Sequence, residues 1–574
     1  MSAPIVPPCV TLRGSDGIWM HYGPPTNKRK EDFRDTNKNC RCMAFSSDGN
    51  LFAYINGKFV IVVDLRSNAI VCQLQKPKTI FLEFSPKSTY LATWESYYVV
   101  AGTPQGQLGP NNLNIWDVKT GSLVKGFIQK NANNWCPQWS DDEGICSRTV
   151  TNEVHFYADG NFDTFKTKLR LEKLSDSCIT KTGPPYYIAT YVPGSKGQPS
   201  FVRLYKYPEF TGTNSIIANK SFFKAESVTM HWNFQGTAVL VLTSVESSAD
   251  SYYGDQGLHF IPTNGDSSLV PLGKNGPVYH LEWNPKSPHF CVVYGFMPAK
   301  ATLYNMKCEP VFDFGTGPRN FVHFNPFGSV LCLAGFGNLS GHIEFWDVKK
   351  HKLISKIKAA DTTSFEWCPN GEYILTATTA PRLRVDNNFK IWHYTGSLVY
   401  DEKCQHSQEL WEAVWQPVSA GTYQAPLIRY KPQENADTTV NEPKVQVYRP
   451  PGARGTPSTL KLHENEPPSN SKQNENLSKA ALKNKKKREA RKAKQEQELP
   501  VQTSHTPASS STSDTLTTGD AEKDKKIRNL KKKIDAIEKL KQQLNEGKSL
   551  ELNQLEKIKT EDKLRKELEA ITLH

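Results

Sequence analysis

The chain has 574 residues, with 71 Lys and Arg against 58 Asp and Glu, a net charge of +13, and only 37% hydrophobic residues. This length exceeds one ordinary domain, and the low hydrophobic fraction beside 11% aromatic residues indicates a well-packed part joined to a part poor in apolar side chains. The sequence has no N-terminal signal peptide and no apolar run of about 18–20 residues, so we expect a protein that is neither secreted nor inserted in a membrane. The 12 cysteines are scattered without a CxxC pair, which favours buried reduced thiols in a cytoplasmic protein over zinc ligation.

An internal repeat dominates the first three quarters of the chain. A short alternating run ends in an aromatic residue, a turn rich in Ser, Asn, Pro, Asp and Gly follows, and then a β-branched run begins. Eight such aromatic anchors occur: Phe45, Phe84, Trp139, Trp232, Trp283, Phe324, Trp367 and Trp415. Their spacings are 39, 55, 93, 51, 41, 43 and 48 residues. The interval of 93 spans about two periods and contains the strand-like runs 186–191 and 200–205, so we expect a ninth, degenerate unit there.

A period of about 40–50 residues with short strands is typical of the four-stranded blade of a β-propeller. The runs 114–121 and 344–349 end a strand in Trp-Asp before a turn, as WD-type repeats do, while the run 390–396 has His393 in place of the Asp. The sequence therefore predicts a mainly β protein with a nine-bladed WD-type propeller over residues 1–431. We expect residues 10–21 to complete the last blade beside residues 423–430, because ring closure removes exposed strand edges.

The repeat ends near residue 432, and four further segments are predicted. Residues 432–471 form a linker rich in Pro, Asn and Glu, and residues 499–520 form a disordered Ser/Thr-rich run. Residues 472–498 form a basic helical segment, in which residues 472–494 alone carry ten Lys or Arg and two Glu, a net charge of +8. Residues 521–574 place apolar residues at helical spacing on both sides of Gly547, which predicts a helical hairpin or a coiled-coil partner site.

Motifs of catalysis are incomplete in this sequence. Asp313-Phe-Gly spells a kinase magnesium motif without a catalytic loop, and residues 335–341 join two predicted strands where a dinucleotide site needs a helix. Gly547-Lys-Ser lacks the first glycine of a P-loop, because Gln542 occupies that position. We therefore predict a protein that is not an enzyme and needs no metal and no cofactor. A propeller hydrolase with acids and histidines gathered at the central channel stays open as a minor alternative.

Binding is the remaining function, and the charge pattern indicates RNA. The dense basic run has enough cations to contact several phosphates, and its members are Lys483, Lys485, Lys486, Lys487, Arg488, Arg491, Lys492 and Lys494. A solvated tail or a nuclear-import signal is the alternative. A second candidate RNA-binding set lies near loop ends on the propeller rim and comprises Lys300, Arg319, Arg382 and Arg384, for which ordinary surface charge is the alternative.

Several stretches of this sequence resemble the eukaryotic translation initiation factor 2A family. They are the runs beginning Phe296-Met-Pro-Ala-Lys, Phe312-Asp-Phe-Gly-Thr-Gly-Pro-Arg-Asn, Leu333-Ala-Gly-Phe-Gly-Asn-Leu, Ala380-Pro-Arg-Leu-Arg-Val and Lys390-Ile-Trp-His-Tyr-Thr-Gly, with Leu477-Ser-Lys-Ala-Ala-Leu-Lys-Asn and Asn553-Gln-Leu-Glu-Lys-Ile in the tail. The resemblance implies a nine-bladed propeller followed by a flexible, basic, helical region.

The resemblance also implies a function and partners. It implies delivery of initiator methionyl-tRNA to the small ribosomal subunit, dependent on the codon and independent of GTP, for a subset of mRNAs. The expected partners are the small ribosomal subunit, initiator tRNA, mRNA and, through the C-terminal helices, other initiation factors. No interaction with a membrane is expected. The alternative is a ribosome-associated WD-type scaffold that does not touch tRNA.

Overall fold

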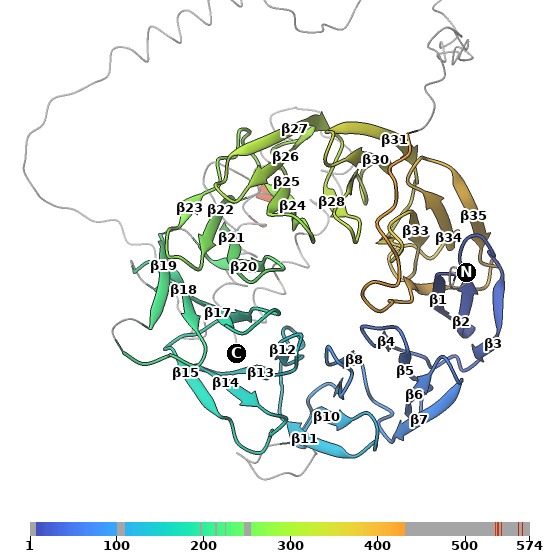
Figure 1. Ribbon diagram of the computed structural model, residues 1–574, viewed down its shortest axis with the longest axis horizontal. Coiled ribbons are helices and arrows are strands. Elements are labelled where there is room, and N and C mark those ends of the chain that lie inside the picture. Colours follow the sequence, from blue (N-terminus) through green and yellow to red (C-terminus); the bar gives the residue numbers. More distant parts are fainter. Residues whose placement is uncertain are drawn as a thin grey trace, which may run out of the picture. The chain divides into compact units, whose positions relative to one another are not determined.

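The computed structural model describes residues 7–99, 109–195, 198–212, 215–223, 225–245 and 254–430, together with Ile534, Ile537, Glu538, Lys541, Glu561 and Arg565. The chain divides into two compact units, residues 1–443 and 444–574. In the first unit, nine four-stranded sheets stand side by side around an axis, as Figure 1 shows. The nine-bladed propeller predicted from the repeat is therefore confirmed.

Eight blades are antiparallel meanders of consecutive strands, running from the centre of the ring outwards. The first four are β4 to β7 (Met43–Phe45, Leu51–Ile55, Val60–Asp64, Ala69–Leu74), β8 to β11 (Phe81–Phe84, Tyr90–Trp94, Leu113–Asp117, Leu123–Phe127), β12 to β15 (Gln138–Trp139, Ile145–Val150, Glu153–Ala158, Thr167–Arg170) and β16 to β19 (Asp176–Ile179, Tyr187–Val192, Ser200–Lys206, Ile216–Phe222).

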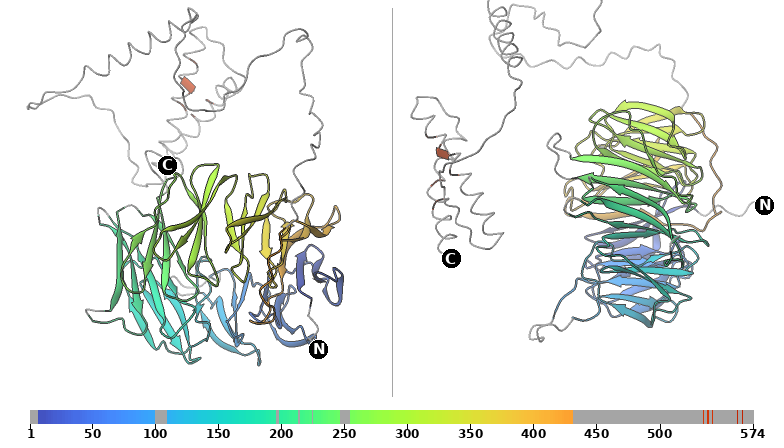
Figure 2. Two further views of the ribbon diagram at one scale, coloured as in Figure 1. Left: turned by 45° about the horizontal axis from the view of Figure 1, so that its top comes forward. Right: turned by 90° about the vertical axis from the view of Figure 1, so that its left-hand side faces the viewer.

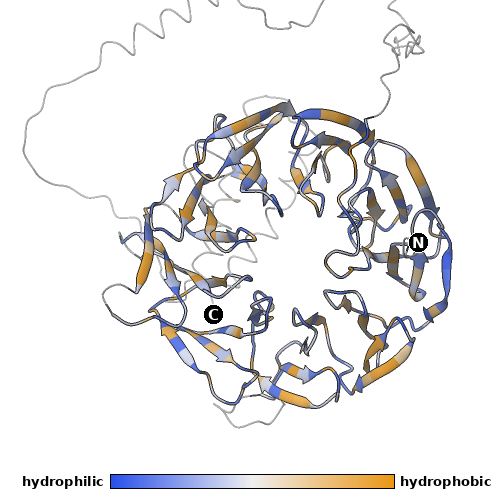
Figure 3. Ribbon diagram, in the orientation of Figure 1, coloured by the Kyte–Doolittle hydropathy of each residue, from blue (hydrophilic) through white to orange (hydrophobic). Residues whose placement is uncertain are grey.

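The next four blades follow the same plan. They are β20 to β23 (Ser227–Trp232, Ala238–Val245, Asp255–Pro262, Ser268–Leu269), β24 to β27 (Val278–Trp283, His289–Tyr294, Ala299–Asn305, Pro310–Gly317), β28 to β31 (Phe321–Phe324, Val330–Ala334, His342–Asp347, Lys352–Lys358) and β32 to β35 (Ser364–Trp367, Tyr373–Thr378, Asn388–His393, Leu398–Lys403). Apolar residues concentrate in the strands, which also carry polar ones, whereas the connecting loops are mostly polar, as Figure 3 shows.

The ninth blade joins the two ends of the propeller. Its inner strand is β36 (Leu410–Trp415), and the N-terminal strands β1 (Cys9–Gly14), β2 (Gly17–Tyr22) and β3 (Arg29–Asp35) complete it. The closing segment was predicted correctly, but its predicted partner was wrong. β1 pairs with β36, whereas residues 423–430 form no strand. The position of the last anchor explains this result. Trp415 ends the inner strand β36, and no strand follows β36 in the described part of the propeller, so the N-terminal strands complete this blade.

Each aromatic anchor is the last residue of an inner strand, and where a second strand follows along the chain, the residue after the anchor closes the turn to it. Ser140 Oγ accepts a hydrogen bond from Ile145 N at 3.1 Å, and Asn233 Oδ1 accepts one from Ala238 N at 3.2 Å. In the degenerate blade, Ile179 replaces the aromatic anchor, and Thr180 Oγ1 accepts from Tyr187 N at 2.9 Å. The turn chemistry is therefore kept where the aromatic signal is lost.

The Trp-Asp motif has a local role in the turn between the third and fourth strands. Asp347 Oδ1 accepts hydrogen bonds from the backbone N–H groups of Lys349 and Lys350, both at 2.9 Å. In the next blade His393 Nδ1 lies 2.7 Å from Thr395 Oγ1 and accepts from Thr395 N at 3.3 Å. The substitution of Asp by His thus keeps an acceptor at the position that the turn requires.

Polar side chains join neighbouring inner strands. The residue before one anchor accepts the backbone N–H of the next anchor: Gln138 from Ile179 at 2.9 Å, Glu282 from Phe324 at 2.8 Å, and Glu366 from Trp415 at 2.8 Å. In the other direction, three anchor tryptophans, Trp232, Trp283 and Trp367, donate Nε1–H to the preceding inner strand, as Trp283 does to His231 O at 2.8 Å. These bonds satisfy groups that the inner edge of each sheet would otherwise leave unpaired.

Glu366 makes ring closure sensitive to pH. Burial raises the pKa of its carboxyl to about 7, so the folded protein holds a proton that the unfolded chain, with a glutamate pKa of about 4.3, releases. The free energy of unfolding should therefore fall as pH rises from about 4.3 to about 7. Glu366→Gln removes this dependence and keeps an acceptor for Trp415 N. We expect the variant to exceed the native protein in stability by about 1–3 kcal/mol at pH 8, and to match it near pH 4.5.

Thermal melting of both proteins between pH 4.5 and 8 measures this difference. Glu412→Gln is the matched control, because Glu412 pairs with Arg13 on the same blade at 2.9 Å. A pH dependence of melting that is the same in Glu366→Gln and the native protein would contradict the assignment.

In the second unit, six described residues are helical. Arg565 pairs with Glu538 at 2.7 Å, and Lys541 pairs with Glu561 at 2.6 Å. Ile534 and Ile537 are buried. These ion pairs link positions on either side of Gly547, which is the contact expected between the two arms of a helical hairpin. The described part of the chain contains no helix with the length and apolarity that crossing a bilayer requires.

Candidate binding surfaces of the propeller

The two faces of the ring carry different connections. In an antiparallel meander successive turns lie at opposite ends. The loops between second and third strands and the connectors between blades therefore share one face, here called the loop face, and the remaining turns share the other, here called the turn face. Figure 2 shows the ring edge-on, with loops at both faces.

Exposed apolar side chains concentrate on the loop face. Val385 is 67% exposed and Phe223 is 85% exposed, and both lie in loops of this face. Within residues 7–430 as described, the large apolar side chains exposed outside the strands are Tyr98, Val99, Phe223, Phe296, Met297, Leu383 and Val385 on the loop face, and Phe165, Phe234 and Leu427 on the turn face. These loop-face residues lie in four separate connections around the ring, and because they outnumber those on the turn face, the loop face is the stronger candidate for an interaction surface.

Four of the five propeller stretches that resemble a known family reach this same face. The run 296–302 begins in the β25–β26 loop and enters β26, the run 312–320 ends in the β27–β28 connector, and the runs 333–339 and 380–385 lie largely in the β29–β30 and β33–β34 loops. The fifth run, 390–396, follows β34 into the β34–β35 turn and so lies on the turn face. The β29–β30 and β33–β34 loops contact each other. Arg382 Nη2 packs so closely on Gly337 that a Cβ atom built on this glycine would lie only 2.7 Å from it. Positions that are far apart in the sequence thus build one surface.

All four predicted rim cations lie on the loop face, but in two different states. Arg382 and Arg384 lie in one exposed loop, and the side chain of Arg384 is 69% exposed at 3.8 Å from Glu409. Lys300 pairs with Asp313 at 2.9 Å and is mostly buried. Arg319 is buried, and it donates to Glu344 at 2.7 Å and to the carbonyl oxygen of Phe314 at 3.1 Å.

Arg319 therefore holds the β27–β28 connector in place, and its buried guanidinium presents little surface to a ligand. The exposed pair of cations is Arg382 and Arg384. The basic run from Lys483 to Lys494 lies outside the described residues, and its role stays a prediction.

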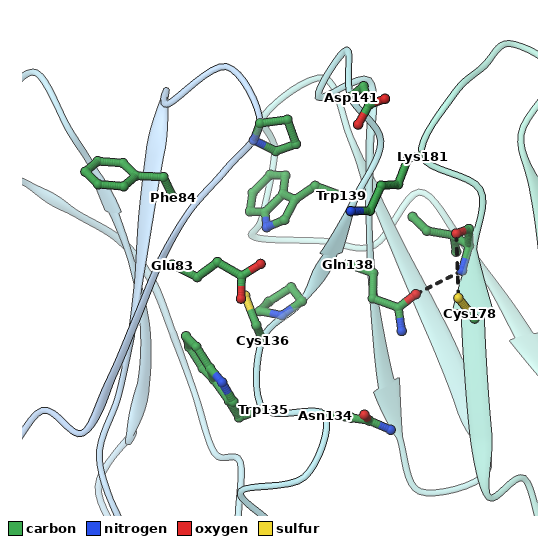
Figure 4. Close-up of a pocket in the computed structure, with 13 residues that line it drawn as sticks. Glu83, Phe84, Asn134, Trp135, Cys136, Gln138, Trp139, Asp141, Cys178 and Lys181 are labelled. Carbon is green, nitrogen blue, oxygen red and sulfur yellow. Dashed lines mark hydrogen bonds between the residues drawn. The ribbon is translucent and has the colours of Figure 1, made fainter. Parts of the chain in front are cut away.

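A groove of about 460 Å³ lies between the inner strands β8, β12 and β16. Figure 4 shows Trp135 and Cys136 beside Glu83 at one end and Asp141 and Lys181 at the other. Burial, and then Glu83, raise the pKa of the Cys136 thiol well above its ordinary value, which disfavours the reactive thiolate.

Acids and histidines do gather on the inner strands, as the hydrolase alternative required. Glu282 accepts from Phe324 N at 2.8 Å and lies 2.7 Å from His323 Nδ1, and His280 Nδ1 lies 2.9 Å from Val322 O. Burial lowers the pKa values of His231 and His280. These groups bond to one another and to neighbouring backbone, so their contacts join blades. Among the described residues no three His, Cys, Asp or Glu are placed to hold a metal.

The ring of nine four-stranded sheets defines the chain as a β-propeller protein. Comparison with known proteins specifies it further. Residues 220–413 match the family model described as eukaryotic translation initiation factor eIF2A, and residues 525–571 match the model of the eukaryotic translation initiation factor 2A C-terminal domain.

Curated relatives extend the match to the whole chain. The chain is 38% identical to eukaryotic translation initiation factor 2A of Drosophila melanogaster, with 99% of each chain covered, and 36% identical to that of Schizosaccharomyces pombe, with 94% of each covered. A solved structure titled as a eukaryotic initiation factor is similar with a TM-score of 0.66 and 36% identity, covering 72% of this chain and 100% of the other. The chain therefore belongs to the eukaryotic translation initiation factor 2A family, and it acts in translation initiation.

Proposed function

We propose that this protein directs initiator methionyl-tRNA to the small ribosomal subunit in a codon-dependent, GTP-independent manner for a subset of mRNAs, in the cytoplasm. The loop face docks on the small subunit or the tRNA, and the basic segment 472–494 adds RNA affinity that does not depend on sequence. The observation that carries the proposal is the convergence of the family-like loops, with Arg382 and Arg384 exposed among Leu383 and Val385, on one face of a rigid ring.

Two separate contacts of moderate strength suit such a carrier. A linked second contact acts at an effective concentration set by the linker, so two weak RNA contacts give one stronger attachment. The segment 472–494 has a net charge of +8, and each phosphate it neutralises makes affinity more dependent on salt. The segment 521–574, which contains Glu538 and Arg565, contacts another initiation factor in this proposal.

Filter binding of labelled initiator tRNA tests the proposal on the full chain. We expect Arg382→Glu with Arg384→Glu to weaken binding about tenfold or more at moderate salt, because two favourable contacts become repulsive. Deletion of 472–494 should weaken binding most at low salt and flatten the dependence of affinity on salt.

Lys87→Glu with Lys307→Glu is the matched control, because both residues are exposed lysines on the turn face. Equal loss in this control would show that the loop face has no special role. If no variant alters tRNA binding while co-sedimentation with small subunits persists, the scaffold alternative replaces the proposal.

A further inference from the structure

A second cationic surface lies on the loop face at the blade of β8 to β11, away from the rim cations predicted from sequence. The segment after β9 brings Tyr97 and Tyr98 beside the connectors that precede β8 and β12. Lys78 Nζ lies 4.7 Å from the ring centre of Tyr98, and Lys130 Nζ lies 5.4 Å from that of Tyr97. We call these four residues the lysine–tyrosine patch.

The patch is held in place by the surrounding backbone. Tyr97 Oη accepts a hydrogen bond from Gly109 N at 2.8 Å, and Trp94 Nε1 donates to Gln129 O at 3.0 Å, which fixes the connector carrying Lys130. Lys78 and Lys130 are exposed, and Tyr98 is 44% exposed. A nearby carboxylate, Glu95, is buried and lies 3.7 Å from Lys76, and among the described residues neither Lys78 nor Lys130 forms an ion pair.

A polar cleft of about 530 Å³ adjoins the patch at Lys130. It separates the β11–β12 connector from the β13–β14 loop, and it contains one acid, Asp176, which accepts from Asn134 Nδ2 at 2.9 Å. Arg148 lines its wall. The groups that face the cleft with amide or hydroxyl side chains are Gln129, Asn131, Asn133, Asn134, Thr149, Thr151 and Ser175. Amide side chains of this kind can donate to and accept from the edges of nucleic-acid bases.

We propose that the lysine–tyrosine patch and its cleft bind a single-stranded segment of RNA. Exposed aromatic rings beside cations suit unpaired bases, which stack on the rings while their phosphates meet the lysines. Double-stranded RNA hides the faces of its bases and would use only the lysines. An acidic peptide would likewise use the lysines and leave Tyr98 without a role. The dependence of binding on the Tyr98 ring therefore separates these partners.

The proposal goes beyond the carrier function, because it concerns a different blade and an unpaired strand. The test measures binding of a labelled single-stranded RNA 12-mer of mixed sequence to the full chain, at raised salt so that the basic tail contributes less. We expect Tyr98→Ala to weaken binding roughly 5- to 100-fold and Tyr98→Phe to retain most of it, because the ring supplies the stacking. Lys78→Ala with Lys130→Ala should lower the slope of log affinity against log salt by about 1.4, at about 0.7 per phosphate contact on a single strand.

Phe234→Ala is the matched control, because Phe234 is an aromatic residue 60% exposed on the turn face. Cross-linking of a 4-thiouridine RNA to the native protein should label the peptide that contains Tyr97 and Tyr98. The proposal is overturned if Tyr98→Ala binds the 12-mer like the native protein, if Phe234→Ala loses as much affinity, or if a duplex of equal length binds as well with the same dependence on Tyr98. Melting of each variant shows whether it is folded. Loss of initiator tRNA binding in the Arg382 and Arg384 variant, with 12-mer binding intact, would uphold the carrier function independently.

Discussion

Leu12→Ala should destabilise the propeller by about 2–5 kcal/mol, because Leu12 is fully buried at the junction between the two ends of the ring. It packs in one cluster with Leu375, Phe389 and Trp415, and its backbone pairs with Ala413. The loss should be concentrated in the ninth blade, so amide hydrogen exchange in β1 and β36 should speed up more than in the opposite blades.

Leu398→Ala is the control for this change, since Leu398 is 47% exposed on an outer strand. We expect it to cost less than about 1 kcal/mol. Thermal melting and hydrogen exchange on the same samples provide the measurement. Comparable destabilisation by the two variants would show that the closure is not a special point of the ring.

Arg319→Ala should lower stability by about 2–4 kcal/mol, because it removes one partner of a buried ion pair and leaves the Glu344 carboxylate with Lys356, at 3.0 Å, and Trp346 Nε1, at 3.2 Å. The same change should abolish the hydrogen bonds to Phe314 O and Gly315 O that hold the β27–β28 connector. At a temperature where the variant remains folded, we expect its affinity for RNA to stay within about twofold of the native protein.

Arg384→Ala provides the opposite case on the same face. Its side chain is exposed, so its removal should cost less than about 0.5 kcal/mol of stability and should reduce RNA binding. Urea unfolding and filter binding on both variants give the comparison. If the Arg319→Ala protein is fully stable yet deficient in RNA binding, Arg319 binds RNA and does not have the structural role assigned to it.

The interpretation of the repeat depended on residues with a local function. An aromatic anchor followed by Ser or Asn predicted a strand end and a turn because those side chains close the turn within five residues, as Ser140 and Ile145 show. The degenerate blade lacked the aromatic signal, but the pair Ile179 and Thr180 kept the turn, and this pair is the feature that could have located it. The unusual interval of 93 residues between Trp139 and Trp232 revealed the blade without the help of this pair.

The candidate surfaces were harder to predict, because the type of a residue does not determine whether its side chain is exposed in the folded protein. Arg319 and Arg384 are both arginines near loop ends, yet only Arg319 is buried, where it pairs with the Glu344 carboxylate on β30. The sequence did not predict the lysine–tyrosine patch, because Lys78, Tyr98 and Lys130 belong to three separate segments. These segments lie close together only because of the way in which neighbouring blades pack.

By itself the sequence determined the number of blades, the position of most inner strands and the concentration of charge in the tail, where residues 472–494 and 521–574 contribute +8 and +4 of the net +13. These features depend on residues close together in the chain, through turn chemistry, alternation and composition. Only the tertiary structure decided which strand closes the ring, which arginine is buried and which lysines share a surface. Those outcomes depend on contacts between residues up to about 400 positions apart, such as Arg13 with Glu412, and no local pattern encodes them.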